Sequence, residues 1–131
     1  VVTPEPTSVT DAYAIMKVMS KKHAVTNFKL IVNEVKDEKK AVDLFKSLSG
    51  VAERFLNIYI EYIGFIVRDN HVPMSIKKQK LTTILYPDSR FSMCLLKIAK
   101  KILNAQPETD STGNIGFFWD RLLDGKRSNE Q

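Results

Sequence analysis

The chain has 131 residues and a formal net charge of +5 at neutral pH, and 44% of its residues are hydrophobic and 27% charged. This length fits a single domain, and no apolar run approaches the roughly 18 residues that a transmembrane helix requires. Cys94 is the only cysteine. An internal disulfide is therefore excluded, and we expect the reducing environment of the cytoplasm.

Positive charge is concentrated in one part of the chain. Residues 70–104 contain seven Lys or Arg against one acidic residue, whereas residues 1–69 contain ten against nine. These seven basic residues are Lys77, Lys78, Lys80, Arg90, Lys97, Lys100 and Lys101. They fit either solvated helix faces or a surface for nucleic acid or anionic lipid. Because the chain has a single Trp and no RNA-binding motif, we do not expect nucleic acid as a partner.

The chain begins with a pattern typical of a strand that leads into a helix. The segment Val1–Val2 has the β-branched side chains of a strand, and Pro4 and Pro6 keep the backbone before them extended. Ser8 is predicted to cap the helix, and Asp11, three residues later, completes a capping-box pattern. The apolar face of this helix is predicted to contain Val9, Ala12, Tyr13, Met16 and Met19.

Two further strands are predicted, with a helix between them. The segment Phe28–Val35 is apolar and β-branched, as in a strand covered on both faces, and Ile60–Val67 has the same character. Residues 37–56 predict a helix whose apolar stripe contains Ala41, Leu44, Phe45, Leu48, Ala52 and Phe55. Strands that alternate with helices in this way imply right-handed crossovers and a parallel sheet.

The last part of the domain is predicted to be helical. Residues 70–80 predict a short helix with Pro73 in its first turn, and the segment "TTILYPDS" (residues 82–89) predicts a loop. Asp88 or Ser89 then caps a long helix. Its core face is predicted to contain Phe91, Cys94, Leu95, Ile98, Ala99, Ile102 and Leu103. The domain is thus expected over residues 1–104, followed by a polar, turn-rich linker over residues 105–114.

The tail, residues 115–131, predicts a short amphipathic helix. Its apolar residues recur at helical spacing, and they are Ile115, Phe118, Trp119, Leu122 and Leu123. Behind a flexible linker, such a helix can anchor a protein at a membrane surface. The alternative is a terminal helix that folds back onto the domain, because the tail is locally acidic and surface anchors usually favour Lys and Arg.

The sequence contains no complete catalytic motif. Its five glycines form neither a phosphate-binding P-loop nor a dinucleotide-binding loop, and no G-x-S-x-G motif is present. His23 and His71 have no Cys or carboxylate at metal-ligand spacing. We therefore predict no catalytic residue and no metal ligand in this chain.

Two positions near predicted strand ends are candidates for ligand binding. Asn33 lies near the end of one strand, and the residues Val67, Arg68 and Asp69 lie at the end of the next. In open α/β sheets, ligands bind outside the carboxyl ends of the strands. An Asn amide can both donate to and accept from a base edge. The alternative for Asn33 is that it caps a turn.

Several segments together resemble the C-terminal half of the MinD/ParA-class ATPases. In chain order they are "VVTPEPTSVTDAYA", "FKLIVNEVKDEKKAVDLFKSLSGVAERFL", "IEYIGFIVRD" and "KKQKLTTILYPDSR". Within this class they resemble the flagellar-number regulators, called FlhG or YlxH. The resemblance runs from Val1 to about Asn104, and the tail stands where that family carries a membrane-targeting amphipathic helix.

The resemblance implies a fold and a set of partners. The fold would be half of a deviant-Walker P-loop NTPase domain, which is an α/β, three-layer parallel sheet with flanking helices, followed by a short C-terminal amphipathic helix. The family binds ATP and Mg²⁺ and forms a nucleotide-sandwich homodimer. That dimer binds the membrane and proteins of flagellar assembly. The implied location is the cytoplasm, with peripheral association at the bacterial inner membrane.

The resemblance also implies roles for individual residues. Those expected at the adenine base are Asn33, Val67, Arg68 and Asp69. Those expected at the dimer or partner surface are Glu5, Ser8 and Asp11. The apolar residues of the tail would contact an anionic membrane surface.

The sequence departs from the family pattern at two places. Val67 and Leu81 stand where the family commonly has proline. In the family, the P-loop, both switch regions and the Mg²⁺-binding aspartates precede the position of Val1. Without them, phosphoryl transfer loses its main electrostatic stabilisation. We therefore expect this chain alone neither to hydrolyse ATP nor to bind it tightly. The alternative function is a nucleotide-independent protein- or membrane-interaction module from a truncated α/β domain.

Overall fold

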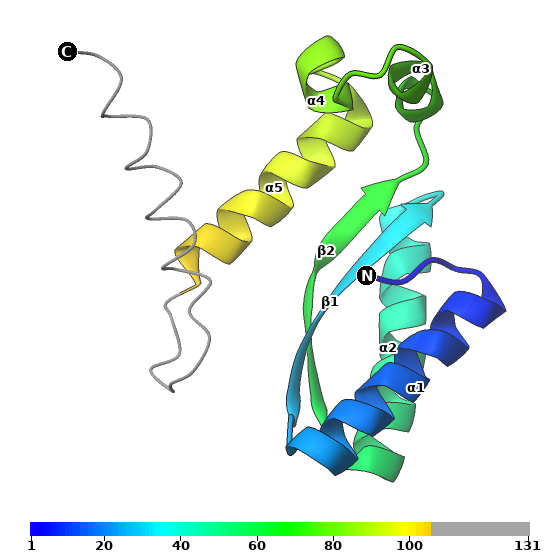
Figure 1. The fold of residues 1–131 in the computed structure, drawn as a ribbon, viewed down its shortest axis with the longest axis vertical. Helices are drawn as coiled ribbons and strands as arrows, with labels where there is room; N and C mark the ends of the chain where they lie inside the picture. The colour runs from blue at the N-terminus through cyan, green and yellow to red at the C-terminus, as the bar shows by residue number, and fades with distance from the viewer. Residues whose placement is uncertain (106–131) are drawn as a thin grey trace.

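The computed structural model of the chain describes residues 1–105, which form an α/β structure (Figure 1). The elements in chain order are α1 (Pro6–His23), β1 (Asn27–Val35), α2 (Glu38–Leu56), β2 (Tyr59–Val67), α3 (His71–Lys77), α4 (Thr82–Leu85) and α5 (Arg90–Asn104). The predicted tail helix lies outside the described residues, as does all of the predicted linker after Ala105. No helix in the described part is long and apolar enough to cross a membrane.

The sheet is parallel, as the alternation of strands and helices predicts. β1 pairs with β2 along its length, from Asn27 opposite Tyr59 to Val35 opposite Val67. On the other side of β1, Val2 forms an isolated parallel bridge with Val32. The N–H of Val2 donates to the carbonyl of Ile31 at 2.9 Å, and its own carbonyl accepts from Asn33 at 2.7 Å. The predicted strand character of Val1–Val2 is therefore confirmed at Val2.

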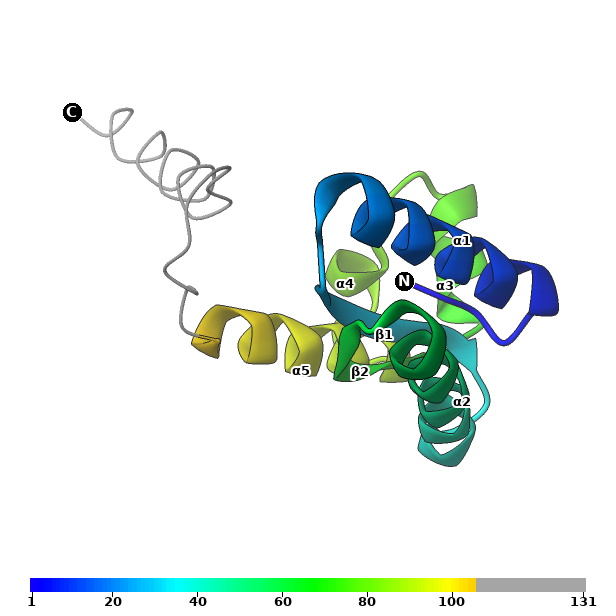
Figure 2. The same ribbon diagram turned by 90° about the horizontal axis from the view of Figure 1, so that it is seen from below.

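The helices divide the core into two clusters. α1 and α2 pack against each other, and together with the sheet they bury the larger cluster, which includes Met16, Val32, Leu48 and Ile60. α5 packs on β2, where Ile63, Ile66 and Ile98 form a second cluster. In Figure 2, β2 lies between α5 and α2. The predicted α/β class, parallel sheet and flanking helices are confirmed. The complete three-layer domain remains a proposal, because the described sheet contains two strands and one bridging residue.

The two strands do not pair in a single register. Leu30 lies opposite Tyr62 but Ile31 lies opposite Gly64, so β2 contains one extra residue at this point. A second shift follows in β1, where Glu34 adopts a left-handed backbone conformation with φ of 59°. Such bulges bend a strand and change the direction of its side chains.

Gly64 allows α5 to pack closely on the sheet. A Cβ atom built at this position would lie 2.9 Å from Cγ1 of Ile98. Real Cβ atoms do not approach another heavy atom so closely. The side chain of Ile98 therefore occupies the space that a larger residue in β2 would fill.

The start of α1 differs from the prediction. The helix begins at Pro6, two residues before Ser8, with Glu5 as the N-cap residue and no side-chain capping hydrogen bond. Proline suits the first position of a helix because its nitrogen has no hydrogen to leave unpaired. Ser8 lies inside the helix, and its Oγ accepts from the N–H of Thr3 at 3.0 Å. The predicted capping role of Ser8 is wrong, and the residue fixes the turn between Val2 and α1 instead.

The region before α5 is more ordered than predicted. The segment predicted as a loop contains α4, a single helical turn. The prediction that Asp88 or Ser89 caps the next helix is confirmed for Ser89, whose Oγ accepts from the N–H of Ser92 at 3.2 Å. The hydroxyl of Ser92 in turn donates to the carbonyl of Tyr86 at 2.7 Å.

Parts of the predicted helix stripes are exposed in the described structure. On α2, Ala41, Leu48 and Ala52 are buried, but the side chain of Phe55 is 64% exposed. On α5, Ile98 is buried, whereas Leu103 is 77% exposed. The last turn of α5 therefore extends beyond the surface that β2 offers it.

Candidate functional site

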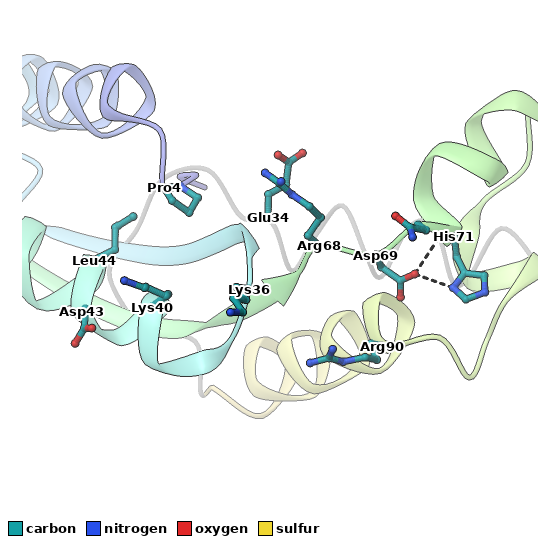
Figure 3. A pocket seen from close by; sticks show the side chains of 11 residues that line it. Pro4, Glu34, Lys36, Lys40, Asp43, Leu44, Arg68, Asp69, His71 and Arg90 are labelled. Carbon is teal, nitrogen blue, oxygen red and sulfur yellow. Dashed lines mark hydrogen bonds and ion pairs between the residues drawn. The ribbon is translucent and has the colours of Figure 1, made fainter.

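The carboxyl ends of both strands open into a cleft with a volume of about 990 Å³ (Figure 3). Its residues come from the segment before α1, from the end of β1 and the segment that follows it, and from the start of α2. Others come from the segment joining β2 to α3 and from the starts of α3 and α5. The basic residues that line it are Lys36, Lys40, Arg68 and Arg90. The acidic ones are Glu34, Asp43 and Asp69. The position of the cleft is where parallel sheets bind ligands.

The basic residues of the cleft form no ion pairs with carboxylates within residues 1–105. Within residues 1–105, the single ion pair joins Asp69 and His71. Neither the two lysines nor the two arginines of the cleft lie within ion-pair distance of an acidic side chain in that range. The lining thus has four cationic side chains against three carboxylates, one of which, Asp69, is paired with His71, and its unpaired cations can contact an anionic ligand.

Asp69 is held by three hydrogen bonds and is the most constrained side chain of the cleft. One carboxylate oxygen accepts from the backbone N–H of His71 at 2.9 Å and from its ring Nδ1 at 2.7 Å. The other oxygen accepts from the N–H of Phe91 at 3.0 Å. The backbone donor of His71, followed by that of Phe91, holds the pKa of Asp69 below its ordinary value, although burial acts in the opposite direction. Asp69 therefore joins the end of β2 to the starts of α3 and α5.

Arg68 and Val67 have different positions, although they are neighbours. Arg68 is exposed and lines the cleft, and its backbone N–H donates to the carbonyl of Val35 at 2.9 Å. The side chain of Val67 is only 3% exposed and belongs to the buried core. Of the residues predicted at the adenine base, the structure thus places Arg68 and Asp69 in the lining and Val67 behind it.

Asn33 lies near the cleft but is not among the residues that line it. Its side chain is half-buried, and Oδ1 accepts from the N–H of Glu34 at 2.8 Å, beside the left-handed residue that ends the regular pairing of β1. This contact agrees with the alternative in which Asn33 closes a turn. Among residues 1–105, Nδ2 has no hydrogen-bond partner. A contact between this amide and a base remains a prediction.

The predicted dimer or partner residues lie at the entry to α1. Glu5 and Asp11 are exposed, whereas Ser8 is half-buried and bonded to Thr3. Pro4, in the same segment, lines the cleft. This segment and the cleft therefore adjoin, and any ligand or partner at one lies next to the other.

Of the lining residues, the sequence assigns Arg68 and Asp69 to a ligand site, and those without such an assignment include Lys36, Lys40, His71 and Arg90. Lys36 and Lys40 lie just after β1, where the segment "VKDEKK" gave a signal that was not used. Arg90 was noted as part of the basic region alone, and His71 was considered only as a metal ligand. Lys36 and Arg90 are 54 positions apart in the sequence. They line one cleft because the carboxyl ends of β1 and β2 lie at the same edge of the sheet.

The described residues suit an organic anion better than a metal ion. No group of three His, Cys, Asp or Glu side chains that can hold a metal occurs within residues 1–105. Both oxygens of Asp69 already accept hydrogen bonds. The guanidinium of Arg68 and the amide of Asn33, by contrast, are suitable donors to a base or a phosphate.

No protein-family model matches the chain, but known protein sequences do. It is 32% identical over 123 residues to the antiactivator FleN of Pseudomonas aeruginosa. It is 29% identical over 128 residues to the flagellum site-determining protein YlxH of Helicobacter pylori. An uncharacterized ATP-binding protein of Methanocaldococcus jannaschii is 29% identical over 125 residues.

These alignments cover nearly all of the chain but less than half of each relative. They include 94%, 94% and 95% of this chain, and 44%, 42% and 44% of the three relatives, in the same order. The resemblance found in the segments around Pro4, Asn33 and Asp69 therefore extends over nearly all of the chain. These relatives support the resemblance of the chain to the FlhG/YlxH family of the MinD/ParA class, and the chain spans less than half of their length.

Proposed function

We propose that the chain is the C-terminal part of an FlhG-like, ATP-binding nucleotide switch that controls the number and placement of flagella. One of its relatives is named as a flagellum site-determining protein, one as the antiactivator FleN and one as an ATP-binding protein. The observation that carries the proposal is the cleft at the carboxyl ends of β1 and β2, with four basic residues that have no acidic partner within residues 1–105.

In this proposal the chain supplies one wall of the nucleotide site. Arg68 and the amide of Asn33 contact the adenine or its ribose, Asp69 fixes the wall by its three hydrogen bonds, and Val67 supports it from the core. The lysines and arginines attract the polyphosphate. The remainder of the parent protein supplies the Mg²⁺ site and the catalytic groups, since the described residues offer no metal site.

The proposal extends to assembly and location. The intact parent forms a homodimer around ATP, and Glu5, Ser8 and Asp11 contribute to its dimer or partner surface, which meets proteins of flagellar assembly. The tail, with Ile115, Phe118, Trp119, Leu122 and Leu123, anchors this assembly at the anionic inner surface of the bacterial membrane. The protein then acts in the cytoplasm, at the membrane surface.

The nucleotide site can be tested on this chain. We expect a fluorescent ATP analogue to bind weakly, and Arg68→Ala to raise its Kd about fivefold or more, because one charge-assisted contact contributes about 1–2 kcal/mol. Arg54→Ala is the matched control, since Arg54 lies in the last turn of α2 and does not line the cleft. Fluorescence anisotropy gives both constants.

Two results would contradict the nucleotide site. One is equal weakening by both arginine substitutions, which would indicate a general charge effect. The other is no detectable binding of the analogue by the unaltered chain together with none by the intact parent. That second result would favour the alternative function, a nucleotide-independent module for protein or membrane interaction.

A further inference from the structure

Residues 76–84, from the last two residues of α3 into α4, form a protrusion whose surface is both apolar and basic. Ile76 is 69% exposed, Leu81 66% and Ile84 69%, although all three are large aliphatic side chains. Lys77, Lys78 and Lys80 are exposed between them. Figure 1 shows α3 and α4 together at one end of the molecule, beyond the carboxyl end of β2. We call residues 76–84 the basic–apolar protrusion.

The backbone of this protrusion is fixed, so the exposed side chains are held outward. Ser75 at its start is 1% exposed, and Thr82, at the beginning of α4, is 8% exposed. Between these two buried residues, the N–H of Gln79 donates to the carbonyl of Ile76 at 3.0 Å. The N–H of Lys80 donates to the carbonyl of Ser75 at 3.2 Å. The protrusion therefore presents its apolar side chains without a rearrangement of the chain.

The charge of the protrusion is of one sign. It contains three lysines and no acidic residue, and Asp88 is the one carboxylate in residues 70–104. No lysine of the protrusion belongs to an ion pair within residues 1–105. Lys78 lies over the ring of Tyr86, and its ammonium donates to the hydroxyl of that residue. Lys77 and Lys80 have no such contact in that range.

We propose that the basic–apolar protrusion is a membrane-contact site that takes the headgroup region of an anionic lipid bilayer. An anionic bilayer can contact the aliphatic side chains and the lysines of the protrusion at once. The aliphatic side chains enter the acyl boundary, while the lysines remain among the anionic headgroups. Nucleic acid would use the lysines but leave the aliphatic side chains in water. The site lies within the described domain, and it does not depend on the proposed anchor in the tail.

The experiment uses the full chain with the tail disabled by Phe118→Asp and Trp119→Asp. This protein is sedimented with phosphatidylserine–phosphatidylcholine vesicles and, separately, with pure phosphatidylcholine vesicles. We expect binding to the anionic vesicles alone, and a marked decrease between low and physiological ionic strength. Comparison with the unaltered tail measures the contribution of the tail independently, so failure of the tail anchor and failure of this site are distinguishable.

Two pairs of substitutions then test the surface itself. Lys77→Gln with Lys80→Gln is expected to reduce partitioning about twenty-five-fold, since each lysine near an anionic surface contributes about fivefold. Leu81→Ser with Ile84→Ser is expected to reduce it by at least tenfold. Lys78 is left unchanged because of its contact with Tyr86. Circular-dichroism melting confirms that each variant is folded.

Matched controls are available on α1. Lys17 and Lys21 are exposed lysines, and Ile15 and Val18 are aliphatic side chains that are 62% and 48% exposed. Replacing these pairs in the same way is expected to leave binding within about twofold. Equal losses for the α1 variants would overturn the proposal, as would equal binding to anionic and neutral vesicles. Concentration-dependent dimerisation that Leu81→Ser with Ile84→Ser abolishes would also overturn it, by assigning the surface to a second copy of the chain.

Discussion

At the scale of single residues, Asp69 connects β2 to the starts of α3 and α5 through its hydrogen bonds. Its side chain is 9% exposed, and its two oxygens accept hydrogen bonds from two different helix starts. Replacing an oxygen of this carboxylate with an amide NH₂ places a donor opposite another donor. The backbone N–H of His71 or that of Phe91 would then lose its acceptor in a partly buried place. Leaving such a donor without a partner lowers the free energy of unfolding by more than the hydrogen bond itself contributes.

We therefore expect Asp69→Asn to lower the free energy of unfolding by about 2–3 kcal/mol. Asp43→Asn is the control, because Asp43 lines the same cleft but is exposed and makes no hydrogen bond or ion pair through its side chain within residues 1–105. That variant should change stability by no more than about 0.5 kcal/mol. Urea unfolding followed by circular dichroism measures both, and similar values for the two variants would remove the special role of Asp69.

The same residue predicts a dependence of stability on pH. The pKa of Asp69 in the folded state is lowered, chiefly by the backbone N–H of His71. The charged form is therefore favoured by folding, and the stability it contributes is complete above the ordinary pKa of an aspartate and is lost as the pH falls through the lowered value. The stability difference between the unaltered protein and Asp69→Asn should shrink over this acidic range. A difference that grows on acidification would contradict the assignment.

At the scale of elements, α5 is attached to the sheet at three points. Phe91 at its start donates to Asp69, Ile98 in its middle packs over Gly64, and Lys101 near its end donates to the carbonyl of Tyr62 at 2.5 Å. Tyr62 is the last residue of β2 before the register shifts. The lysine thus satisfies a backbone carbonyl beside the bulge. The three attachments hold one helix along most of one strand.

Two glycines provide a matched test of this packing. Gly64→Ala should destabilise the protein by about 1–3 kcal/mol, because the added methyl group would lie 2.9 Å from Ile98 and force a shift of the side chain or of α5. Gly50→Ala should stabilise it by about 0.5–1 kcal/mol, because Gly50 is inside α2 with no atom within 4 Å of the added Cβ. Thermal unfolding should show midpoints that move in opposite directions, and a shared direction would contradict the contact.

The same scale shows what the sequence predicts well. The limits predicted for both strands and for the long helices are nearly correct. Continuous apolar, β-branched runs indicate the strands, and apolar periodicity indicates the helices. α4 was missed because a helix of four residues is too short to show a period. The prediction that Ile102 and Leu103 belong to the core face of α5 is wrong for another reason, since they are 50% and 77% exposed. A stripe shows which side of a helix is apolar but not how far the neighbouring sheet extends beneath it.

At the scale of the whole molecule, the strand ends locate the candidate site but do not reveal its full lining. Arg68 and Asp69 follow a predicted strand, and their place at the cleft is visible in the sequence. Arg90 reaches the same cleft only because Asp69 fixes the start of α5 there. Contacts between distant segments have no local signal, so they could not be predicted from one sequence.

The chain as a whole is expected to be inactive toward ATP by itself. None of its 131 residues belongs to a P-loop motif, and positioned cations around the transferred phosphoryl group supply most of the catalysis in such enzymes. Phosphate release by the purified chain should equal the rate without protein, even where the fluorescent analogue binds. Release above that rate, sensitive to Arg68→Ala, would show that a catalytic arrangement exists within these residues.

The hydrogen bond between Ser8 and Thr3 has a consequence for solubility. Val2 directs its N–H and carbonyl toward β1, so the N–H of Thr3 points toward the free side of the short strand. A free N–H at a sheet edge is a docking point for the backbone of another molecule, and rows of them promote aggregation. Because the hydroxyl of Ser8 occupies this donor, the N–H of Thr3 is not available to a foreign strand. The side chain predicted to start a helix thus shields the border of the sheet.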